Sequence, residues 1–428
     1  MKASELKKNI ENGGLDTTLI SLYGEEKLSA SRDRYMHAVC DFATRFGNRE
    51  AHIFSVSGRT ELSGNHTDHN FGKVIAASVD LDVIAVASSC ADGIITVKSE
   101  GFGEDSVSLD DYATPNEALF GTSASIIAGV AAGFKKNGHR VGGFCAYTTS
   151  NVLKGSGLSS SAAFENMIGT VLSHFYNDGA VDNVEIAMIS QYAENVFFGK
   201  PCGLMDQVAC AVGGVVAIDF EDKNAPKIEK IDFSPTDASY ALCIVNTGGN
   251  HAELTGDYAA VPAEMKEVAA SLGVEVLRQT DREALMTNLP ELRGKLSDRA
   301  LLRAFHFFAE NERVAAQTEA LKNCDVKAYF EGAIASGRSS FCYLQNVYTT
   351  KNVGEQGISL ALCLAESEIV KSGLGGAWRV HGGGFAGTIQ AFVAKDALES
   401  LKSTMENAFG EGSCYVLKIR HEGATKVI

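Results

Sequence analysis

Sixteen residues near the amino terminus, 57–72, hold a dense set of polar side chains between glycines. They include Arg59, Asn65, His66, Asp68 and His69. A core strand could not bury so many donors and acceptors without partners, because each unpaired polar group costs free energy. We therefore predict a loop that binds a polar ligand, with a mixture of donors and acceptors suited to sugar hydroxyls.

A glycine- and serine-rich run at 155–161 precedes a stretch of helical periodicity. Apolar side chains recur from Phe164 to Phe175 at spacings of three and four, which predicts a helix that begins near Ser159. The N–H groups and the positive dipole end of that helix would form an anion site. The residues predicted to bind a phosphate of ATP are Gly155, Ser156, Gly157, Leu158, Ser159, Ser160 and Ser161.

This run has two other interpretations. A serine N-cap alone would explain one hydroxyl but not three. A dinucleotide-binding loop would need a third glycine and an acidic residue about 20 positions further on, and both are missing. No Walker-type loop and no protein-kinase motif occurs in the sequence.

A third glycine run, His-Gly-Gly-Gly-Phe-Ala-Gly at 381–387, lies near the carboxyl end. An esterase oxyanion loop is excluded because the chain has no Gly-x-Ser-x-Gly nucleophile elbow. A flexible hairpin remains possible on local grounds. Two further segments are ambiguous in the same way: His66 and His69 resemble metal ligands but lack a third partner nearby, and Asp206 at a helix start resembles a cap.

The bulk composition limits the class of protein. At 428 residues with 45% apolar content, the chain is predicted to form two globular domains. A net charge of -15, with 38 scattered Lys and Arg residues, argues against a nucleic-acid partner. The ten cysteines show no zinc or redox spacing, and no apolar run is long enough for a membrane span or signal peptide. We expect a cytoplasmic protein with reduced thiols; the oligomeric state is open.

Elements that position these segments follow from periodicity and turn residues. Strands are expected at 51–56, 80–89, 93–98, 142–149, 214–220, 240–246, 377–381, 388–393 and 413–419. Helices are expected at 30–46, 122–136, from 159, at 184–198, from 205, and at 257–272, 300–322, 326–337, 354–372 and 395–408. The strands at 80–89 and 93–98 are expected to be adjacent.

The polar, proline-containing stretch 221–238 is the expected domain boundary, which gives domains at 1–230 and 239–428. The first would carry the sugar loop, the phosphate loop and Asp206, and the second would carry the third glycine run. We predict an α+β fold with two layers per domain and the active site in the cleft between the domains.

Together the three glycine-rich segments resemble the three-motif signature of the GHMP small-molecule kinases, and the first resembles the galactokinase branch. In galactokinases the first motif reads approximately Pro-Gly-Arg-x-Asn-Leu-Ile-Gly-Glu-His-Thr-Asp-Tyr-Asn-x-Gly. The residues that coincide with it are Gly58, Arg59, Leu62, Gly64, His66, Thr67, Asp68, Asn70 and Gly72. The segments 155–162, 193–207 and 303–314 also agree with the family, so that the resemblance covers most of the chain.

The resemblance implies a two-domain GHMP-kinase architecture and a role for each matching residue. Asp206 would be the base or charge partner of the anomeric hydroxyl, and Arg59 the cation that lowers its pKa and stabilises the transferring phosphoryl group. Ser161 and Glu194 match the ligands of Mg²⁺. The residues expected to line the sugar pocket are Asn65, His66, Asp68, Gly203 and Tyr258.

The implied reaction is ATP-dependent phosphorylation of D-galactose to α-D-galactose 1-phosphate, as in galactose catabolism by the Leloir pathway. The departures from the family pattern are Asn65 for Glu, His69 for Tyr, Ser57 and Leu153 for Pro, Ala386 for Gly, and Val261 with Pro262 for two Arg. Because an amide both donates and accepts where a glutamate only accepts, the sugar stays open.

A kinase for N-acetylgalactosamine or arabinose is therefore an alternative. A non-catalytic sensor of galactose and ATP is the alternative from another class. Such sensors lose part of the serine–alanine run at the phosphate loop, whereas 159–163 is whole in this chain.

Overall fold

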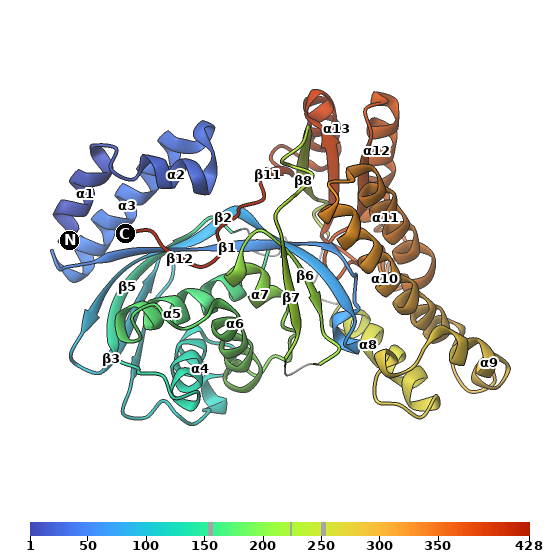
Figure 1. Cartoon of the computed structure of the whole chain (residues 1–428), viewed down its shortest axis with the longest axis horizontal. Coiled ribbons are helices and arrows are strands. Elements are labelled where there is room, and N and C mark those ends of the chain that lie inside the picture. Colours follow the sequence, from blue (N-terminus) through green and yellow to red (C-terminus); the bar gives the residue numbers. More distant parts are fainter. Residues whose placement is uncertain (153–156, 223–224, 250–253) are drawn as a thin grey trace.

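Two β-sheets, each covered by helices on both faces, form the two halves of the molecule (Figure 1). The structure is a computed structural model that describes residues 1–152, 157–222, 225–249 and 254–428. The first sheet has the strand order β12-β1-β2-β5-β3-β4, and β6 and β7 extend it beside β2. Its strands are β1 (His52–Ser63), β2 (Lys73–Cys90), β3 (Ile94–Ser99), β4 (Glu104–Ser108), β5 (Gly143–Ser150), β6 (Val215–Asp219), β7 (Lys227–Ile231) and β12 (Thr425–Lys426).

Neighbouring residues of β1 and β2 enter different hydrophobic clusters. Ile53 and Ile84 face the helices α1 (Ala3–Glu11), α2 (Asp16–Tyr23) and α3 (Leu28–Phe46). Phe54 and Ala85 face the opposite layer, because successive side chains of a strand point to opposite faces. That layer holds α4 (Ser123–Lys136), α5 (Ser160–Tyr176), α6 (Asn183–Tyr192) and α7 (Met205–Val212).

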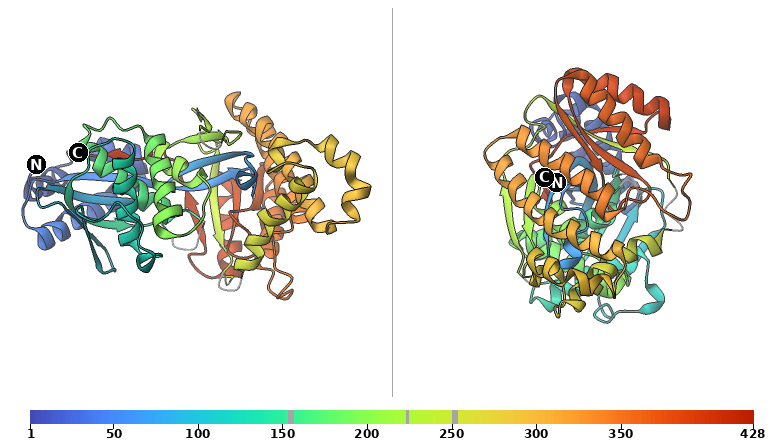
Figure 2. Two further views of the ribbon diagram at one scale, coloured as in Figure 1. Left: turned by 90° about the horizontal axis from the view of Figure 1, so that it is seen from below. Right: turned by 90° about the vertical axis from the view of Figure 1, so that its right-hand side faces the viewer.

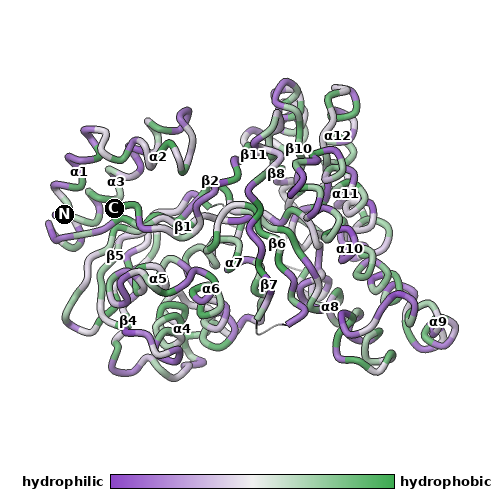
Figure 3. Tube along the Cα trace, viewed as in Figure 1, coloured by the Kyte–Doolittle hydropathy of each residue, from purple (hydrophilic) through white to green (hydrophobic). Residues whose placement is uncertain are grey.

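The second sheet has the order β11-β8-β10-β9. Its strands are β8 (Tyr240–Asn246), β9 (Gly376–Val380), β10 (Thr388–Ala394) and β11 (Cys414–Leu417). One face packs on α10 (Asp298–Lys322) and α11 (Val326–Ser339), and the other on α12 (Gly357–Ser372) and α13 (Leu398–Phe409). The helices α8 (Thr255–Ser271) and α9 (Arg282–Arg293) form a separate cluster with α10. Hydrophilic and hydrophobic segments alternate along these helices, as expected for helices with one buried face (Figure 3).

The mixed helix and sheet class is confirmed, but several local predictions are wrong. Each sheet is the middle of three layers, not one of two, because α1, α2 and α3 cover the outer face of the first sheet and α12 and α13 cover that of the second. The strands expected at 80–89 and 93–98 are not adjacent, since β5 lies between β2 and β3 and pairs with both. The helix α9 was not predicted at all. The stretch 221–238 holds β7, which pairs with β6, and the domain boundary placed there stays a prediction.

Both termini lie at the outer end of the first half (Figure 2). Thr425 and Lys426 pair with β1, and the N–H of Ile53 donates to the carbonyl of Ile428 at 3.2 Å. The chain therefore returns to the first sheet after it completes the second. We propose that the second unit ends with β11 rather than at residue 428.

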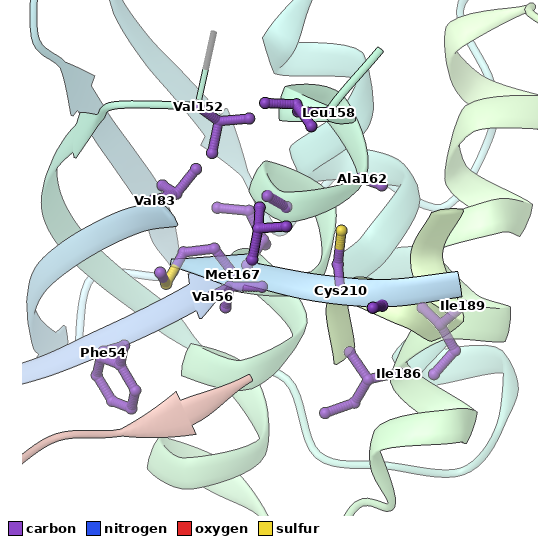
Figure 4. Packing of buried hydrophobic residues seen from close by; sticks show 14 of the residues in the cluster. Phe54, Val56, Val83, Val152, Leu158, Ala162, Met167, Ile186, Ile189 and Cys210 are labelled. Atoms are coloured by element: carbon purple, nitrogen blue, oxygen red, sulfur yellow. The ribbon is translucent and has the colours of Figure 1, made fainter. Parts of the chain in front are cut away.

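The hydrophobic core of the first half lies directly beneath the predicted phosphate-binding segment. Figure 4 shows Leu158 beside Val152 and Ala162 on the other side of Leu158, with Val56 of β1 and Met167 of α5 in the same cluster. These side chains are almost fully buried. The start of α5 and the strand that carries Arg59 are thus held by one continuous packing arrangement, and core packing of this kind resists displacement.

Candidate active site

A cavity of about 230 Å³ lies where β1, the loop after it, the start of α7 and the third glycine run meet. Its lining comes from both halves of the chain, so the predicted cleft position fits the structure. The lining residues are Arg59, Glu61, Asn65, His66, Asp68, His69, Pro201, Cys202, Gly203, Met205, Asp206, Gly382 and Gly383. Four of the five predicted sugar-pocket residues are among them.

The end of the cavity nearest α5 is defined by one charged group of three residues. Arg59 Nε donates to Asp206 Oδ1 at 2.7 Å, and Ser159 Oγ donates to Asp206 Oδ2 at 2.5 Å. Arg59 Nη1 also donates to the carbonyl oxygen of Gly157. Gly58 allows this approach, because a Cβ at that position would lie 2.8 Å from the carbonyl oxygen of Leu158. The Arg59–Asp206 pair therefore joins the cavity to the beginning of α5.

Neither Asp206 nor Ser159 uses its side chain to cap a helix. Asp206 lies in the first turn of α7, and Ser159 is the N-cap residue of α5, but neither helix has a side-chain cap. Ser159 has a left-handed backbone with φ +57°, an uncommon conformation that is often found at functional sites. Burial alone would raise the pKa of Asp206, but the charge and hydrogen bonds of Arg59 and the Ser159 hydroxyl outweigh it and lower that pKa. Asp206 is therefore ionised.

The polar segment 57–72 is only partly a loop. Its first half continues β1 to Ser63, fully buried, contrary to the expected loop. Each polar side chain there finds a partner from a distant part of the chain. Thr60 contacts His381 at 3.0 Å, and Ser63 donates to Gln317 at 2.5 Å. The expectation failed because satisfied polar groups cost little to bury, and the partners lie more than 250 positions away.

The second half of the segment is held by α10, which carries the motif at 303–314. Glu310 Oε1 accepts from the backbone N–H groups of Gly64 and Asn65 at 3.2 and 3.4 Å. His306 Nε2 donates to the carbonyl oxygen of Asn65 at 3.0 Å. Burial alone would raise the pKa of Glu310, but nearby positive groups lower it to about 2. A charged carboxylate thus fixes the backbone of this loop.

The same loop holds the third glycine run. Asn65 Nδ2 donates to the carbonyl oxygen of Gly382 at 2.7 Å, and His66 Nε2 donates to that of Gly383 at 2.9 Å. Burial lowers the pKa of His66 to about 4, so the ring is neutral, and its Nε2 is already used in the hydrogen bond to Gly383. Within the described ranges, no cluster of three or more His, Cys, Asp or Glu side chains could hold a metal ion.

Gly203 lies in the lining of the cavity, whereas Tyr258 does not. The Tyr258 hydroxyl donates to the carbonyl oxygen of Gly384 at 2.9 Å, and the residue is not among those that line the cavity. Gly203 lies against Asp68, since a Cβ there would overlap Asp68 Oδ2. Any larger residue at 203 would displace the Asp68 carboxylate. Tyr258 supports the glycine run, whereas Gly203 and Asp68 form the wall of the cavity.

A second cavity of about 410 Å³ opens at the first turn of α5. Ser160 and Ser161 line it with Glu165 one turn further along the helix, and apolar walls come from Val83, Phe102, Ile126 and Phe198. Gly157 and Leu158 directly precede this turn, whereas the predicted residues Gly155 and Ser156 lie outside the described residues. An apolar cavity that ends at free helix N–H groups suits a nucleotide, whose base is flat and whose phosphates are anionic.

Two buried carboxylates, Glu165 and Glu194, share Gln207 as a hydrogen-bond donor, and Glu165 lines the second cavity. Gln207 Nε2 donates to Glu165 Oε2 at 3.1 Å and to Glu194 Oε2 at 2.9 Å, while Lys200 Nζ contacts Glu194 Oε1 at 3.0 Å. Glu165 Oε1 is buried and has no partner in the described structure. Burial and the charge of Glu194 raise the pKa of Glu165 well above its usual value. Such a site favours a cation.

Sequence reasoning missed Glu61, Glu165 and Gln207. Glu165 and Gln207 could have been inferred from position, since Glu165 follows Ser161 by one helical turn and Gln207 follows Asp206. For Glu61 the signal was the motif itself, which has Asn where this chain has Glu.

Comparison with known proteins shows which families the chain resembles. The family description "GHMP kinases N terminal domain" matches residues 124–214, and "Galactokinase galactose-binding signature" matches residues 41–89. The crystal structure of a mevalonate kinase covers 86% of this chain and 99% of its own, with a TM-score of 0.61 at 14% identity, a likeness of fold alone.

Galactokinases are more similar. That of Mycobacterium tuberculosis is 30% identical over 361 residues, which cover 83% of this chain and 92% of the relative. That of Streptomyces coelicolor is 29% identical over 86% of this chain and 91% of the relative. The crystal structure of Lactococcus lactis galactokinase complexed with galactose covers 90% of this chain and 98% of its own, with a TM-score of 0.76 and 25% identity. The chain belongs to the galactokinase family.

Proposed function

We propose that the protein transfers the γ-phosphoryl group of ATP to the anomeric hydroxyl of D-galactose and releases ADP and α-D-galactose 1-phosphate. The observation that carries this proposal is the Arg59–Asp206–Ser159 group, because it connects the polar cavity to the start of α5. In this proposal the sugar occupies the first cavity and ATP the second. The similarity to a galactokinase crystallised with galactose supports the choice of sugar.

The proposed chemistry follows from the charges of these residues. The ionised Asp206 accepts the hydrogen bond of the anomeric hydroxyl and takes its proton as the bond from the sugar oxygen to phosphorus forms. The bond between that phosphorus and the bridging oxygen breaks, and ADP leaves. Arg59 holds Asp206 in place and faces the developing negative charge. The N–H groups at the first turn of α5 bind the phosphates.

Magnesium is the implied metal, and the residues present fit it. Hard oxygen donors are available from the Ser161 hydroxyl and from the carboxylates of Glu194 and Glu165, one of which has an unpartnered buried oxygen. Lys200 already neutralises Glu194, and its side chain is 63% exposed and so can move away. We propose that Ser161 and Glu194 hold Mg²⁺, with Glu165 beside them. The ion supplies positive charge to the phosphates.

Removal of these oxygens should affect the metal and not the sugar. We expect Ser161→Ala combined with Glu194→Gln to raise the concentration of Mg²⁺ needed for half-maximal activity, while the affinity for galactose stays nearly unchanged. Magnesium titrations of ADP release and calorimetric binding of galactose measure the two effects. Loss of galactose binding with an unchanged magnesium requirement would show that the assignment is wrong.

The substrate is tested by a panel of sugars. The purified protein should release ADP from Mg-ATP with galactose and much less with glucose, because side chains remote from the reacting hydroxyl read the orientation of the others. N-acetylgalactosamine and arabinose belong in the same panel. Equal turnover of galactose and glucose would contradict the assignment of galactose as the substrate. Faster turnover of another sugar would make that sugar the substrate. Binding of galactose and ATP without ADP release would indicate a sensor.

All ten cysteines lie in the described residues and none forms a disulfide. No helix among the described residues is long and apolar enough to span a membrane. The free thiols support our proposal that the protein works in the cytoplasm, where thiols stay reduced.

A further inference from the structure

Glu61 occupies the wall of the sugar cavity, two residues after Arg59 on β1. Its side chain lies on the same side of the strand as Arg59, since alternate residues of a strand share a face. Among the described residues, only one of its carboxylate oxygens has a hydrogen-bond partner. Oε1 accepts from Arg379 Nη2 at 2.6 Å and from Asn65 Nδ2 at 3.2 Å.

The other oxygen is directed at the cavity space. Glu61 Oε2 has no hydrogen-bond partner in the described part of the chain, and it is not one of the polar atoms sealed from solvent there. Because the residue as a whole is 5% exposed, the space next to this oxygen is the cavity. A ligand in the cavity can therefore reach one acceptor on Glu61.

Arg379 fixes the charge and the position of this acceptor. It lies on β9 of the second sheet, is 1% exposed, and pairs with Glu61 across the two halves. Burial raises the pKa of Glu61, and the charges of Arg379 and Arg59 oppose that effect. A buried ion pair adds little net stability, because desolvation offsets the attraction. A contact with a ligand explains better why a carboxylate lies at a polar cavity.

Asn65, the expected sugar contact, has no capacity left for a sugar. Its Nδ2 group donates to the Gly382 carbonyl and to Glu61, and its Oδ1 accepts from Asn346 Nδ2 at 2.7 Å. Asn65 is also fully buried. Relative to the galactokinase motif, the two residue types are exchanged: Glu stands at 61 and Asn at 65, and the two side chains contact each other.

We propose that Glu61, through Oε2, accepts a hydrogen bond from a sugar hydroxyl other than the one phosphorylated, and so determines which sugar is used. This inference rests on the proposed function, since Arg59 and Asp206 are assigned to the reacting hydroxyl. Asn65 is then a positioning residue that joins Glu61 to the third glycine run.

The test combines variants of Glu61 with deoxy derivatives of the sugar, in the manner of a double-mutant cycle. We measure kcat, KM and calorimetric Kd for galactose and for its 2-, 3-, 4- and 6-deoxy derivatives, with the wild-type protein, Glu61→Gln and Glu61→Asp. A hydrogen bond to a charged group corresponds to a factor of about 10 to 100. We expect one deoxy sugar to lose about that factor with the wild-type protein, mainly in KM. Glu61→Gln should lose it with galactose and show little further loss with that deoxy sugar.

Glu61→Asp guards against a folding defect. It keeps the negative charge beside Arg379 but withdraws the oxygen from the cavity, so that thermal unfolding should stay close to that of the wild type while the same deoxy discrimination is lost. Equal losses for every deoxy sugar in all three proteins would mean that Glu61 only balances Arg379, which overturns the proposal. If the wild type binds galactose with the expected pattern but releases no ADP, the proposed kinase function fails and the assignment of Glu61 stands.

Discussion

Asp206→Asn should keep the fold and the sugar affinity but lower kcat by about two to four orders of magnitude, the usual contribution of a positioned acid–base group. The amide cannot take a proton from the sugar hydroxyl. The amide also puts an NH2 donor in place of one of the two carboxylate oxygens that now accept hydrogen bonds from Arg59 and Ser159. The Asp206 side chain is 35% exposed and Arg59 retains Gly157 as a partner, so we expect the loss to be catalytic rather than structural.

The measurement separates these effects. Single-turnover ADP formation gives the chemical step, calorimetry gives the galactose Kd, and thermal unfolding reports the fold. Asp178→Asn is a matched control, because that carboxylate is 91% exposed and pairs only with Arg140 among the described residues. A variant of Asp206 that retains most of its kcat would leave Asp206 as a support for Arg59 alone.

The sequence predicted those elements whose information is local. The helix α5 was expected from the periodicity between Phe164 and Phe175, and it begins one residue after the expected start. The strands β5 and β10 also lie where the apolar runs placed them. In each case the prediction rested on a pattern of apolar residues within one element, so it needed no information about distant parts of the chain.

Predictions that depended on pairing failed. The strand β5 enters between β2 and β3 from more than 40 positions away, and no local pattern reports that order. The continuation of β1 through Arg59 and Glu61 was likewise hidden, because its partners are Asp206 and Arg379 on other elements. A polar strand becomes acceptable only when the whole fold supplies its partners.

In the candidate site, too, some assignments could be made from the sequence and others depended on contacts between distant residues. Residue types and spacing predicted an anion site at the start of α5, whereas the roles predicted for Arg59 and Asp206 came from the resemblance to the family. The choice between Asn65 and Glu61 as the sugar contact could not be made from the motif. It depends on Gly382 and Asn346, which occupy the Asn65 amide and come from the second half.

The exchange of Glu61 and Asn65 gives the second large effect. Asn65→Glu alone should lower kcat/KM for every sugar by at least about 100-fold and reduce the free energy of unfolding by about 3–5 kcal/mol, the cost of a buried charge without a partner. The new carboxylate would face Glu61 Oε1 and the Gly382 carbonyl, both acceptors that now receive the Asn65 amide hydrogens. The third glycine run would lose its contact with Asn65 and keep the contact between His66 and the Gly383 carbonyl oxygen.

The double variant Glu61→Asn with Asn65→Glu tests whether the losses come from the added charge or from the position of the carboxylate. It restores one carboxylate and one amide in the galactokinase order, so that much of the lost stability should return, measured by urea unfolding. Asn352→Glu, at an exposed position, controls for the residue change and should alter stability by less than about 0.5 kcal/mol. If Asn65→Glu matches the wild type in stability and in all kcat/KM values, the amide contacts are unimportant. Suppose the double variant recovers stability but changes the preferred deoxy sugar. The position of the carboxylate within this pair then determines which hydroxyl is recognised, since Arg379 holds the carboxylate at position 61 in the wild type.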